Sequence, residues 1–333
     1  MTVAEETTLS TTRRTLLGAT LAAPFIGDRA IAQGVPARPI TVTVPFAAGG
    51  PTDLISRLVA EGMSRDLGQS VVVENVTGAG GTLAAGRVAQ ARPDGTTLLA
   101  HHIGLATTAT LYRRLPFSVT ESFAPLGLVS DAAMTIVSRP DFPATDLAGV
   151  MAIIKRDGEK LNIAHAGLGG ANQLGGMLLQ AAAETKMTTV VFRGSAPAIT
   201  ELMASRIDVF VDQATNTAPF IRDNRIKAYA VTLPERVPGL DLPTTAEAGF
   251  PQISMSTWHG FYAPAATSQE IQQRLNAAIK AALKEERLQA RFAEVVTKPA
   301  TDERSSLAFH RRFLVEEVNR WRPIIQANGE YAD

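Results

Sequence analysis

Short runs in which apolar and polar positions alternate recur along the chain, separated by longer stretches with helical spacing. The run Ile40–Val44 alternates apolar residues with Thr, which predicts a β-strand. The next stretch places apolar side chains at helical spacing from Leu54 to Met63, which predicts an amphipathic helix. Strands that alternate with helices indicate βαβ units around mainly parallel sheets, and therefore an α/β fold.

Both signals continue to the end of the chain. The predicted strands are Ile40–Val44, Val71–Glu74, Thr97–Ala100, Leu126–Val129, Thr135–Ser138, Leu161–Ala164, Thr189–Phe192, Val209–Val211 and Ala228–Thr232. The predicted helices are Asp53–Leu67, Leu83–Ala91, Leu147–Arg156, Gln173–Thr185, Ala196–Ala204, Gln269–Glu286 and Ser305–Gln326. The last two helices carry apolar stripes, which are typical of packing against a core.

Domain boundaries have to be sought in short connections, because no repeat of fixed period and no low-complexity linker divides the chain. Two connections bear proline, near Ser138-Arg139-Pro140 and near Thr232-Leu233-Pro234. If the chain crosses between domains at both, residues 36–138 plus 234–333 form domain 1 and residues 139–233 form domain 2. A layout with two crossovers gives a hinge with a cleft.

Residues 1–32 have the pattern of a twin-arginine export signal. Arg13-Arg14 precedes a mildly apolar run, and Ala30-Ile31-Ala32 supplies an A-x-A cleavage site before Gln33. The apolar run is too short to span a bilayer, and a disordered basic tail is the alternative interpretation. We therefore expect cleavage near Ala32-Gln33 and a mature protein in the periplasm that is not embedded in the membrane.

Composition excludes several classes of function. The chain has 333 residues, no Cys, 32 basic and 32 acidic residues. Without Cys there are no disulfides, no thiol catalysis and no Cys-based metal site. Lys and Arg do not cluster in the mature region, so the charge pattern does not favour binding to nucleic acid or to an anionic membrane.

Glycine and small polar residues gather directly after the predicted strands, where open α/β sheets place their binding crevice. The clearest loop runs from Phe46 to Asp53. Its Gly49-Gly50 pair allows close approach of the backbone, and the helix behind it offers unpaired N–H groups and a positive dipole end. Such a loop suits a carboxylate or phosphate, although a tight turn capped by Thr52 or Asp53 gives the same pattern. Further loops of this kind are Asn75–Thr82, His101–Gly104, Ala166–Asn172, Arg193–Ala198 and Asp212–Asn216.

Familiar nucleotide and catalytic motifs do not occur in the sequence. Gly78-Ala79-Gly80-Gly81 and Gly167-Leu168-Gly169-Gly170 both lack the third glycine of G-x-G-x-x-G, and Ser195 lacks the second glycine of a nucleophile elbow. Adjacent His101 and His102 would point to opposite faces of a strand. The other three histidines are expected to be structural: His165, His259 and His310. The sequence therefore predicts no cofactor and no metal, and an exported enzyme using His101, His102 or Ser195 remains the alternative.

Several blocks of residues stand in a fixed order: Pro45-Phe46-x-x-Gly49-Gly50-x-x-Asp53 with Arg57, Asn75-x-x-Gly78-Ala79-Gly80-Gly81, Pro93-Asp94-Gly95-x-Thr97-Leu98, Phe192-Arg193-Gly194-x-x-Pro197-Ala198, Pro243-Thr244-x-x-Glu247-x-Gly249 and Trp258-x-Gly260-x-x-Ala263-Pro264. From about Arg38 to the C-terminus they resemble the Bug family of extracytoplasmic solute receptors of tripartite tricarboxylate transporters. The resemblance implies a type II periplasmic-binding-protein fold, with two α/β domains joined by a two-crossover hinge and a ligand cleft between them.

The resemblance also implies the residues that meet the ligand. In the family, backbone groups and ordered waters of the first two loops hold a carboxylate; the matching residues here are Phe46, Ala48, Gly49, Thr52, Asp53, Gly78, Ala79 and Gly80. The matching residues of domain 2 are Gly169, Gly170, Ala171, Asn172, Arg193, Gly194, Ser195, Ala198 and Asp212. His101 and His102 complete the candidate set. We expect Thr52, Asn172 and Arg193 to recognise the ligand through their side chains, and Asp53 to cap the first helix.

This chain departs from the usual family residues in three places. Ala171-Asn172 replaces hydroxyl residues, His101-His102 replaces a small Ser/Thr-rich loop, and Arg193 stands where Lys is common, so that it can bind a carboxylate bidentately. We expect a monomeric receptor that binds a dicarboxylate, tricarboxylate or aromatic acid and delivers it to membrane permease subunits. A periplasmic hydrolase and a ligand-sensing receptor of a signalling system are the alternatives.

Overall fold

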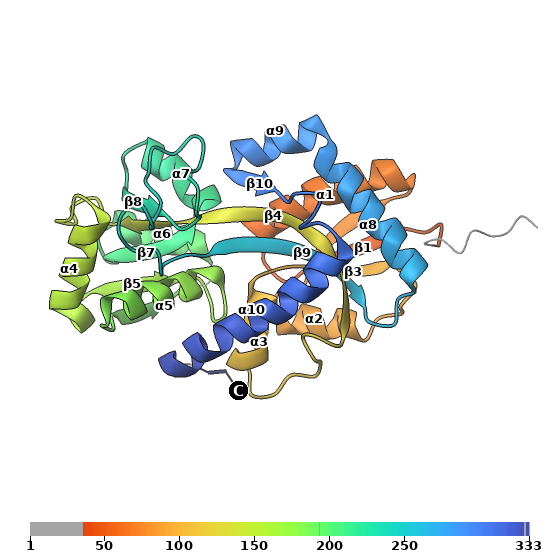
Figure 1. Cartoon of the computed structure of the whole chain (residues 1–333), viewed down its shortest axis with the longest axis horizontal. Coiled ribbons are helices and arrows are strands. Elements are labelled where there is room, and N and C mark those ends of the chain that lie inside the picture. The colour runs from red at the N-terminus through yellow and green to blue at the C-terminus, as the bar shows by residue number, and fades with distance from the viewer. Residues whose placement is uncertain (1–35, 193, 330, 333) are drawn as a thin grey trace, which may run out of the picture. The chain divides into compact units, whose positions relative to one another are not determined.

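A computed structural model of the protein describes residues 36–192, 194–329, 331 and 332. The predicted export signal and its cleavage site lie outside these residues, as does Arg193. The described residues form a mixed sheet of ten strands with helices packed against it (Figure 1). None of the described helices combines the length and the apolar character needed to cross a membrane.

The strands are β1 (Ile40–Val44), β2 (Val71–Asn75), β3 (Thr97–His102), β4 (Phe123–Ser138), β5 (Asn162–His165), β6 (Thr188–Val191), β7 (Val209–Gln213), β8 (Lys227–Val231), β9 (Ser256–Pro264) and β10 (Thr297–Pro299). The α-helices are α1 (Pro51–Leu67), α2 (Thr82–Ala89), α3 (Gly104–Leu111), α4 (Leu147–Asp157), α5 (Ala171–Ala183), α6 (Ser195–Met203), α7 (Ala214–Arg222), α8 (Gln269–Lys284), α9 (Glu286–Glu294) and α10 (Leu307–Asn328). Two 3₁₀ turns are η1 (Ala79–Gly81) and η2 (Gly158–Lys160).

The sheet has the strand order β2-β1-β3-β9-β4-β7-β5-β6, and β8 and β10 pair separately with β4. β1 pairs in parallel with β2 and β3, and β5 pairs in parallel with β6 and β7. The central strands differ, because β9 runs antiparallel to β3 and β4, and β4 runs antiparallel to β7, β8 and β10. The predicted parallel arrangement therefore holds only for the outer strands. β9, whose nine residues are almost all buried, was not predicted from the sequence.

β4 corrects a second expectation. Its sequence predicts two strands, Leu126–Val129 and Thr135–Ser138, separated by residues 130–134, which include the polar Ser130 and Asp131, but the structure has one continuous strand of 16 residues. Both polar residues have partners within the fold: Ser130 contacts His259, and Asp131 pairs with Arg304. A polar residue inside a strand is tolerated where its side chain finds a hydrogen bond.

The pairing partners of β4 change along its length. As far as Ala133 it pairs with β9 and β10, and from Met134 to Ser138 it pairs with β7 and β8. We call one part of the molecule the β1 half: it consists of β1–β3, β9, β10 and the first part of β4, with their helices. The β5 half consists of β5–β8 and the last part of β4, with their helices. The domain boundaries given above stay predictions.

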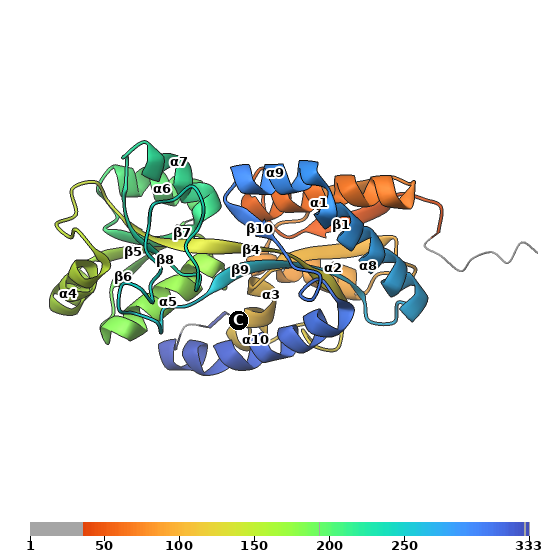
Figure 2. The ribbon, with the colours of Figure 1, turned by 45° about the horizontal axis from the view of Figure 1, so that its top comes forward.

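Helices cover both faces of the sheet in the β1 half. α1 packs against α8 on one face, and α10 packs against α3 on the other (Figure 2). α1 buries Ile55, Val59 and Met63, which are the positions that its helical spacing predicts. α10 is fixed to β9 by the indole N–H group of Trp258, which donates to Glu317; Trp321, on α10 itself, donates to the same carboxylate.

Candidate ligand-binding site

A buried carboxylate fastens the loop between β1 and α1. Asp53 accepts hydrogen bonds from the backbone N–H of Gly49 (2.9 Å), from Asn75 Nδ2 (2.9 Å) and from Arg57 Nε (3.0 Å). Burial acts to raise the pKa of Asp53, but the hydrogen bonds from Arg57, Gly49 and Asn75 outweigh it and leave that pKa below its ordinary value. Asp53 is therefore an ionised group whose oxygens are occupied by protein donors.

Asp53 does not cap α1, contrary to the expectation from the sequence. The N-cap is Gly50, which makes no side-chain cap hydrogen bond, and Pro51 begins the helix. Asp53 accepts instead from Gly49, the residue before the N-cap, so that its carboxylate holds the loop. Asp53 still lies in the first turn of α1, where its negative charge interacts favourably with the positive end of the helix dipole.

The loop after β2 brings its backbone into very close contact with other segments. A Cβ atom at Gly80 would lie 2.4 Å from Tyr112 Oη and 3.0 Å from the carbonyl oxygen of Leu168. At Gly81 the same atom would lie 2.8 Å from His101 Nε2. Both residues have positive φ, of 61° and 99°, a conformation that favours glycine. No side chain fits at these two positions, which explains the glycine-rich sequence.

The candidate residues of these first two loops remain accessible, with few exceptions. Five of them are exposed: Ala48, Gly49, Gly78, Ala79 and Gly80. Thr52 and Asp53 are buried beside them, and Phe46 is half-buried. The exposed backbone of the two loops therefore lies within reach of a solute.

Phe46 packs against the two histidines at the end of β3. Its ring stacks on His102, with 4.4 Å between the ring centroids, and meets His101 edge to face at 5.4 Å. The rings of His101 and His102 are themselves 5.2 Å apart. They do not point to opposite sides as the strand pattern predicts, because β3 ends at His102. Gly104 N–H donates to His102 Nδ1 over 2.8 Å and fixes that ring at the start of α3.

These histidines are neutral at pH 7. Burial lowers the pKa of His102 to about 4, and burial together with the neighbouring His102 lowers the pKa of His101 well below its ordinary value. They therefore act through hydrogen bonds and ring packing, without a positive charge. His101 is fully buried against Gly81, whereas His102 keeps 7 % of its surface exposed.

A third histidine belongs to the same group, and sequence reasoning missed it. His259 Nε2 lies 3.2 Å from Thr52 Oγ1, and His259 Nδ1 lies 3.0 Å from Ser130 Oγ. Its ring also meets that of His102 edge to face. The only signal in the sequence was its place in the block Trp258-x-Gly260. β9 was not predicted as a strand, so nothing placed His259 beside Thr52.

The β5 half has its own buried carboxylate. Asp212, at the end of β7, accepts hydrogen bonds from Asn172 Nδ2, from Ser195 Oγ (3.0 Å) and from Asn216 Nδ2 (3.2 Å). Burial raises the pKa of Asp212 to about 6, against hydrogen bonds from Gln213 N–H, Ser195, Asn216 and Asn172 that act to lower it. The structure thus brings together three predicted residues, Asn172, Ser195 and Asp212, and adds Asn216.

The remaining candidates of the β5 half are backbone or core positions. Ala171 and Ala198 are buried, so their side chains serve packing. Gly169 N–H donates to Gln173 Oε1 over 2.7 Å, and Gly169 O accepts from Thr107 Oγ1 of α3 over 3.2 Å. Gly170 immediately precedes α5, and Gly194 precedes α6 with a φ of 107°.

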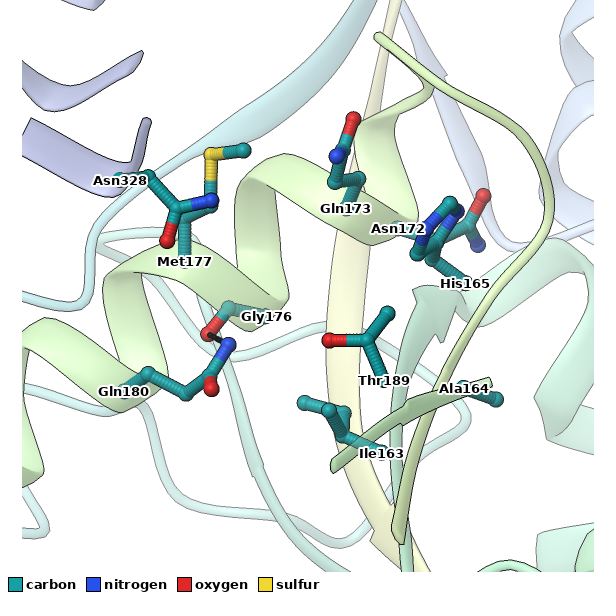
Figure 3. A pocket seen from close by; sticks show the side chains of 10 residues that line it. All are labelled: Ile163, Ala164, His165, Asn172, Gln173, Gly176, Met177, Gln180, Thr189 and Asn328. Atoms are coloured by element: carbon teal, nitrogen blue, oxygen red, sulfur yellow. Dashed lines mark hydrogen bonds between the residues drawn. The ribbon is translucent and has the colours of Figure 1, made fainter. Parts of the chain in front are cut away.

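A small cavity beside α5 is not the ligand site. Its volume of about 10 Å³ holds roughly one water molecule. Figure 3 shows the side chains that line it, with Asn172 beside His165 and with Gln180 donating to the carbonyl of Gly176. Asn172 is the only candidate residue on its wall. Elsewhere in the described chain, no group of three or more His, Asp and Glu could hold a metal ion.

The fold matches that of periplasmic binding proteins. The chain superposes on the solved structure of the periplasmic binding protein BugD with a TM-score of 0.81 and 37% identity, covering 90% of this chain and 100% of that one. MatC from Rhodopseudomonas palustris, solved with bound malate, gives a TM-score of 0.80 and 36% identity over 87% of this chain and 99% of that chain.

Sequence comparison gives the family. The family model described as "Tripartite tricarboxylate transporter family receptor" matches residues 55–330. A relative from Agrobacterium vitis, "UPF0065 protein in the TAR-I ttuE-ttuC' intergenic region", is 42% identical over 296 residues, which is 89% of this chain and 86% of the relative. The chain belongs to this family of transporter receptors, and the resemblance to the Bug proteins is confirmed. The family and its structural neighbours are substrate-binding receptors, so the alternative of an exported enzyme is wrong.

Proposed function

We propose that this chain is a periplasmic receptor that captures a small dicarboxylate between its β1 and β5 halves and delivers it to the permease subunits of a tripartite transporter. It is exported through the signal in residues 1–32 and works as a monomer. Residues 36–138 plus 234–333 and residues 139–233 act as its two domains. β4 and the segment that follows β8 absorb the closing motion.

The observation that carries this proposal is the state of the two buried carboxylates. Asp53 and Asp212 both accept hydrogen bonds from several protein donors, so neither offers a free acceptor to a solute. A ligand in the first loops instead meets the exposed backbone at Ala47 and Ala48, the start of α1 and the Thr52 hydroxyl, because the N–H group of Gly49 already donates to Asp53. Groups of this kind bind anions.

The loops after β5 and β6 bind the other end of the ligand. Asn172 is held by Asp212 and has further amide hydrogen-bonding capacity, and Arg193, placed from the sequence alone, supplies the positive charge. Hydrogen bonds that involve a charged group contribute about 1.5 to 3 kcal/mol each, so three or four of them suffice for micromolar affinity. The malate bound to MatC supports a C4 dicarboxylate as the first ligand to test.

Thermal unfolding of the mature protein tests the ligand class. A ligand that binds the folded state raises the midpoint of unfolding by mass action. We expect malate and succinate to raise it, and the matched neutral diamide of succinate and a neutral sugar to leave it unchanged. Stabilisation by the neutral compounds alone would refute a carboxylate receptor. The same assay with citrate and with an aromatic acid shows whether the receptor also binds tricarboxylates and aromatic acids.

Arg193→Ala, titrated with the acid that stabilises the wild type, should weaken binding at least tenfold. Unchanged affinity would remove Arg193 from the site. Delivery to a permease is tested separately, because uptake of that acid by cells should cease when the receptor is deleted and resume when it is restored. Uptake that continues without the receptor would contradict a transport role.

A further inference from the structure

Three buried polar side chains form a hydrogen-bonded row that leads from the interior of the sheet to the first loop. Ser130 lies on β4, His259 on β9 and Thr52 at the second residue of α1. Ser130 Oγ is 3.0 Å from His259 Nδ1, and His259 Nε2 is 3.2 Å from Thr52 Oγ1. Ser130 is fully buried, His259 is 2 % exposed and Thr52 is 4 % exposed.

The hydrogen bonds of the row can run in two directions, from Thr52 towards Ser130 or from Ser130 towards Thr52, because a neutral imidazole carries its one proton on either Nδ1 or Nε2. If Nδ1 carries it, His259 donates to Ser130, and the Ser130 hydroxyl proton needs a further acceptor. No other hydrogen bond of that hydroxyl is present among the described residues. A buried donor without a partner costs about 1 to 3 kcal/mol, which disfavours this direction.

The opposite direction satisfies Ser130 and His259 within the protein and leaves one hydroxyl proton over, that of Thr52, which unlike Ser130 keeps some exposed surface. Ser130 donates to Nδ1, the Nε2–H group donates to Thr52 Oγ1, and the hydroxyl proton of Thr52 is left for an acceptor outside the row. His259 stays neutral, because burial and the neighbouring His102 lower its pKa well below the ordinary value. The His102 ring, which stacks on Phe46, packs against the edge of His259 and holds it in place.

We propose that His259, oriented by Ser130, is a positioning residue that fixes the Thr52 hydroxyl as a hydrogen-bond donor to the ligand carboxylate. This inference rests on the proposed function, because it assigns an acceptor to a hydroxyl of the same site. A donor held in this way pairs with either oxygen of a carboxylate, but it loses its bond where the ligand presents an amide NH₂ at the same place. The row therefore contributes to the choice of acids over amides.

The direction of the row can be tested without any ligand. The protein has five histidines, so nitrogen-15 spectra that correlate ring nitrogens with ring carbon-bound protons resolve each tautomer. We expect His259 to be protonated at Nε2 and unprotonated at Nδ1. Protonation at Nδ1 would overturn the inference whatever the ligand proves to be.

Coupling between His259 and Thr52 is tested with malate as the probe. Thr52→Val and His259→Phe should each weaken malate about tenfold, and the double variant should be no weaker than either single variant. His259→Gln, whose amide can still donate to Thr52, should recover most of the affinity. Independent, additive losses in the double variant would refute a role through Thr52.

His310→Gln is the matched control. His310 is also fully buried, but its Nδ1 accepts from Gly127 N–H, away from the first loops. This variant should lower the unfolding midpoint without changing malate affinity. If the wild type binds none of the acids tested while His259 has the Nε2–H tautomer, the proposed function fails and the direction of the row stands.

Discussion

The two halves of the receptor each use a buried aspartate to organise their binding loops, and the two aspartates differ in one respect. Asp53 has the guanidinium of Arg57 among its partners, whereas the donors to Asp212 among the described residues are uncharged: Asn172, Ser195, Asn216 and the N–H of Gln213. The pKa of Asp53 consequently lies below its ordinary value, whereas burial raises that of Asp212 to about 6. Burial is the largest influence on both carboxyls: at Asp53 the hydrogen bonds from Arg57, Gly49 and Asn75 outweigh it, whereas at Asp212 burial outweighs the hydrogen bonds.

Because the two pKa values are shifted in opposite directions, the two aspartates make the free energy of unfolding change with pH in opposite senses. Between its ordinary pKa of 3.8 and about 6, Asp212 keeps its proton in the folded chain and has lost it in the unfolded chain. The folded state then binds more protons, so the free energy of unfolding falls as the pH rises through this window. Asp53 contributes stability that is present above pH 3.8 and is lost as the pH falls through its lower folded pKa.

The largest expected effect is that of Asp212→Asn on the pH dependence of stability. Relative to this variant, the wild type should lose roughly 3 kcal/mol of unfolding free energy as the pH rises from about 4 to about 6, which is what a pKa raised from 3.8 to about 6 implies. Urea unfolding across this range measures it. A constant difference between the two proteins would mean that Asp212 keeps its ordinary pKa in the folded state.

Asp53→Ala is the corresponding change in the β1 half. It removes the acceptor of Gly49, Asn75 and Arg57, and we expect a loss of about 2 kcal/mol in unfolding free energy at pH 7. The loss should shrink as the pH falls below 3.8, because the carboxyl then becomes protonated in the unfolded chain and, at lower pH, in the folded chain as well. If it grew as the pH fell, the lowered pKa of Asp53 would be refuted.

Asn172→Ala tests whether the hydrogen bonds around Asp212 also affect ligand binding. Removing one donor to Asp212 should raise the pKa of that carboxyl further, and malate affinity at pH 7 should fall about tenfold, or 1.4 kcal/mol. Calorimetric titration measures the affinity, and unfolding against pH measures the pKa. Asn75→Ala is the control, because it disturbs Asp53 and leaves the titration of Asp212 where it was.

The smallest effect on the two titrations is expected of Gly194→Ala. Gly194 has a φ of 107° and a ψ of 168°, a region nearly restricted to glycine, and a Cβ there would meet nothing within 4 Å, so the cost is backbone strain alone, on the order of 1 to 3 kcal/mol. The titration of Asp212 should not change. A loss of several kcal/mol, seen in thermal unfolding, would show that the loop before α6 is packed more tightly than the structure has it.

Much of the site could be predicted from local sequence. Loops rich in glycine follow strands whose alternation is clear, and Asp53 and Arg57 are four residues apart on one helix, so their ion pair follows from helix geometry. The error over the cap of α1 is also local in origin. Asp53 has a suitable type and position for a cap, but the tight turn at Gly49 offers its carboxylate a nearer N–H group.

The sequence by itself determined the α/β class, the strands that carry the loops, and the glycines and polar residues placed at their ends, because these depend on short-range periodicity and backbone freedom. Only the tertiary structure decided what those residues do. Asp212 meets a residue 40 positions away, and Thr52 meets His259 across 207 positions. Contacts at such distances leave no periodic signal, and burial, which sets the charge of Asp212 and the histidines, exists only once the sheet is assembled.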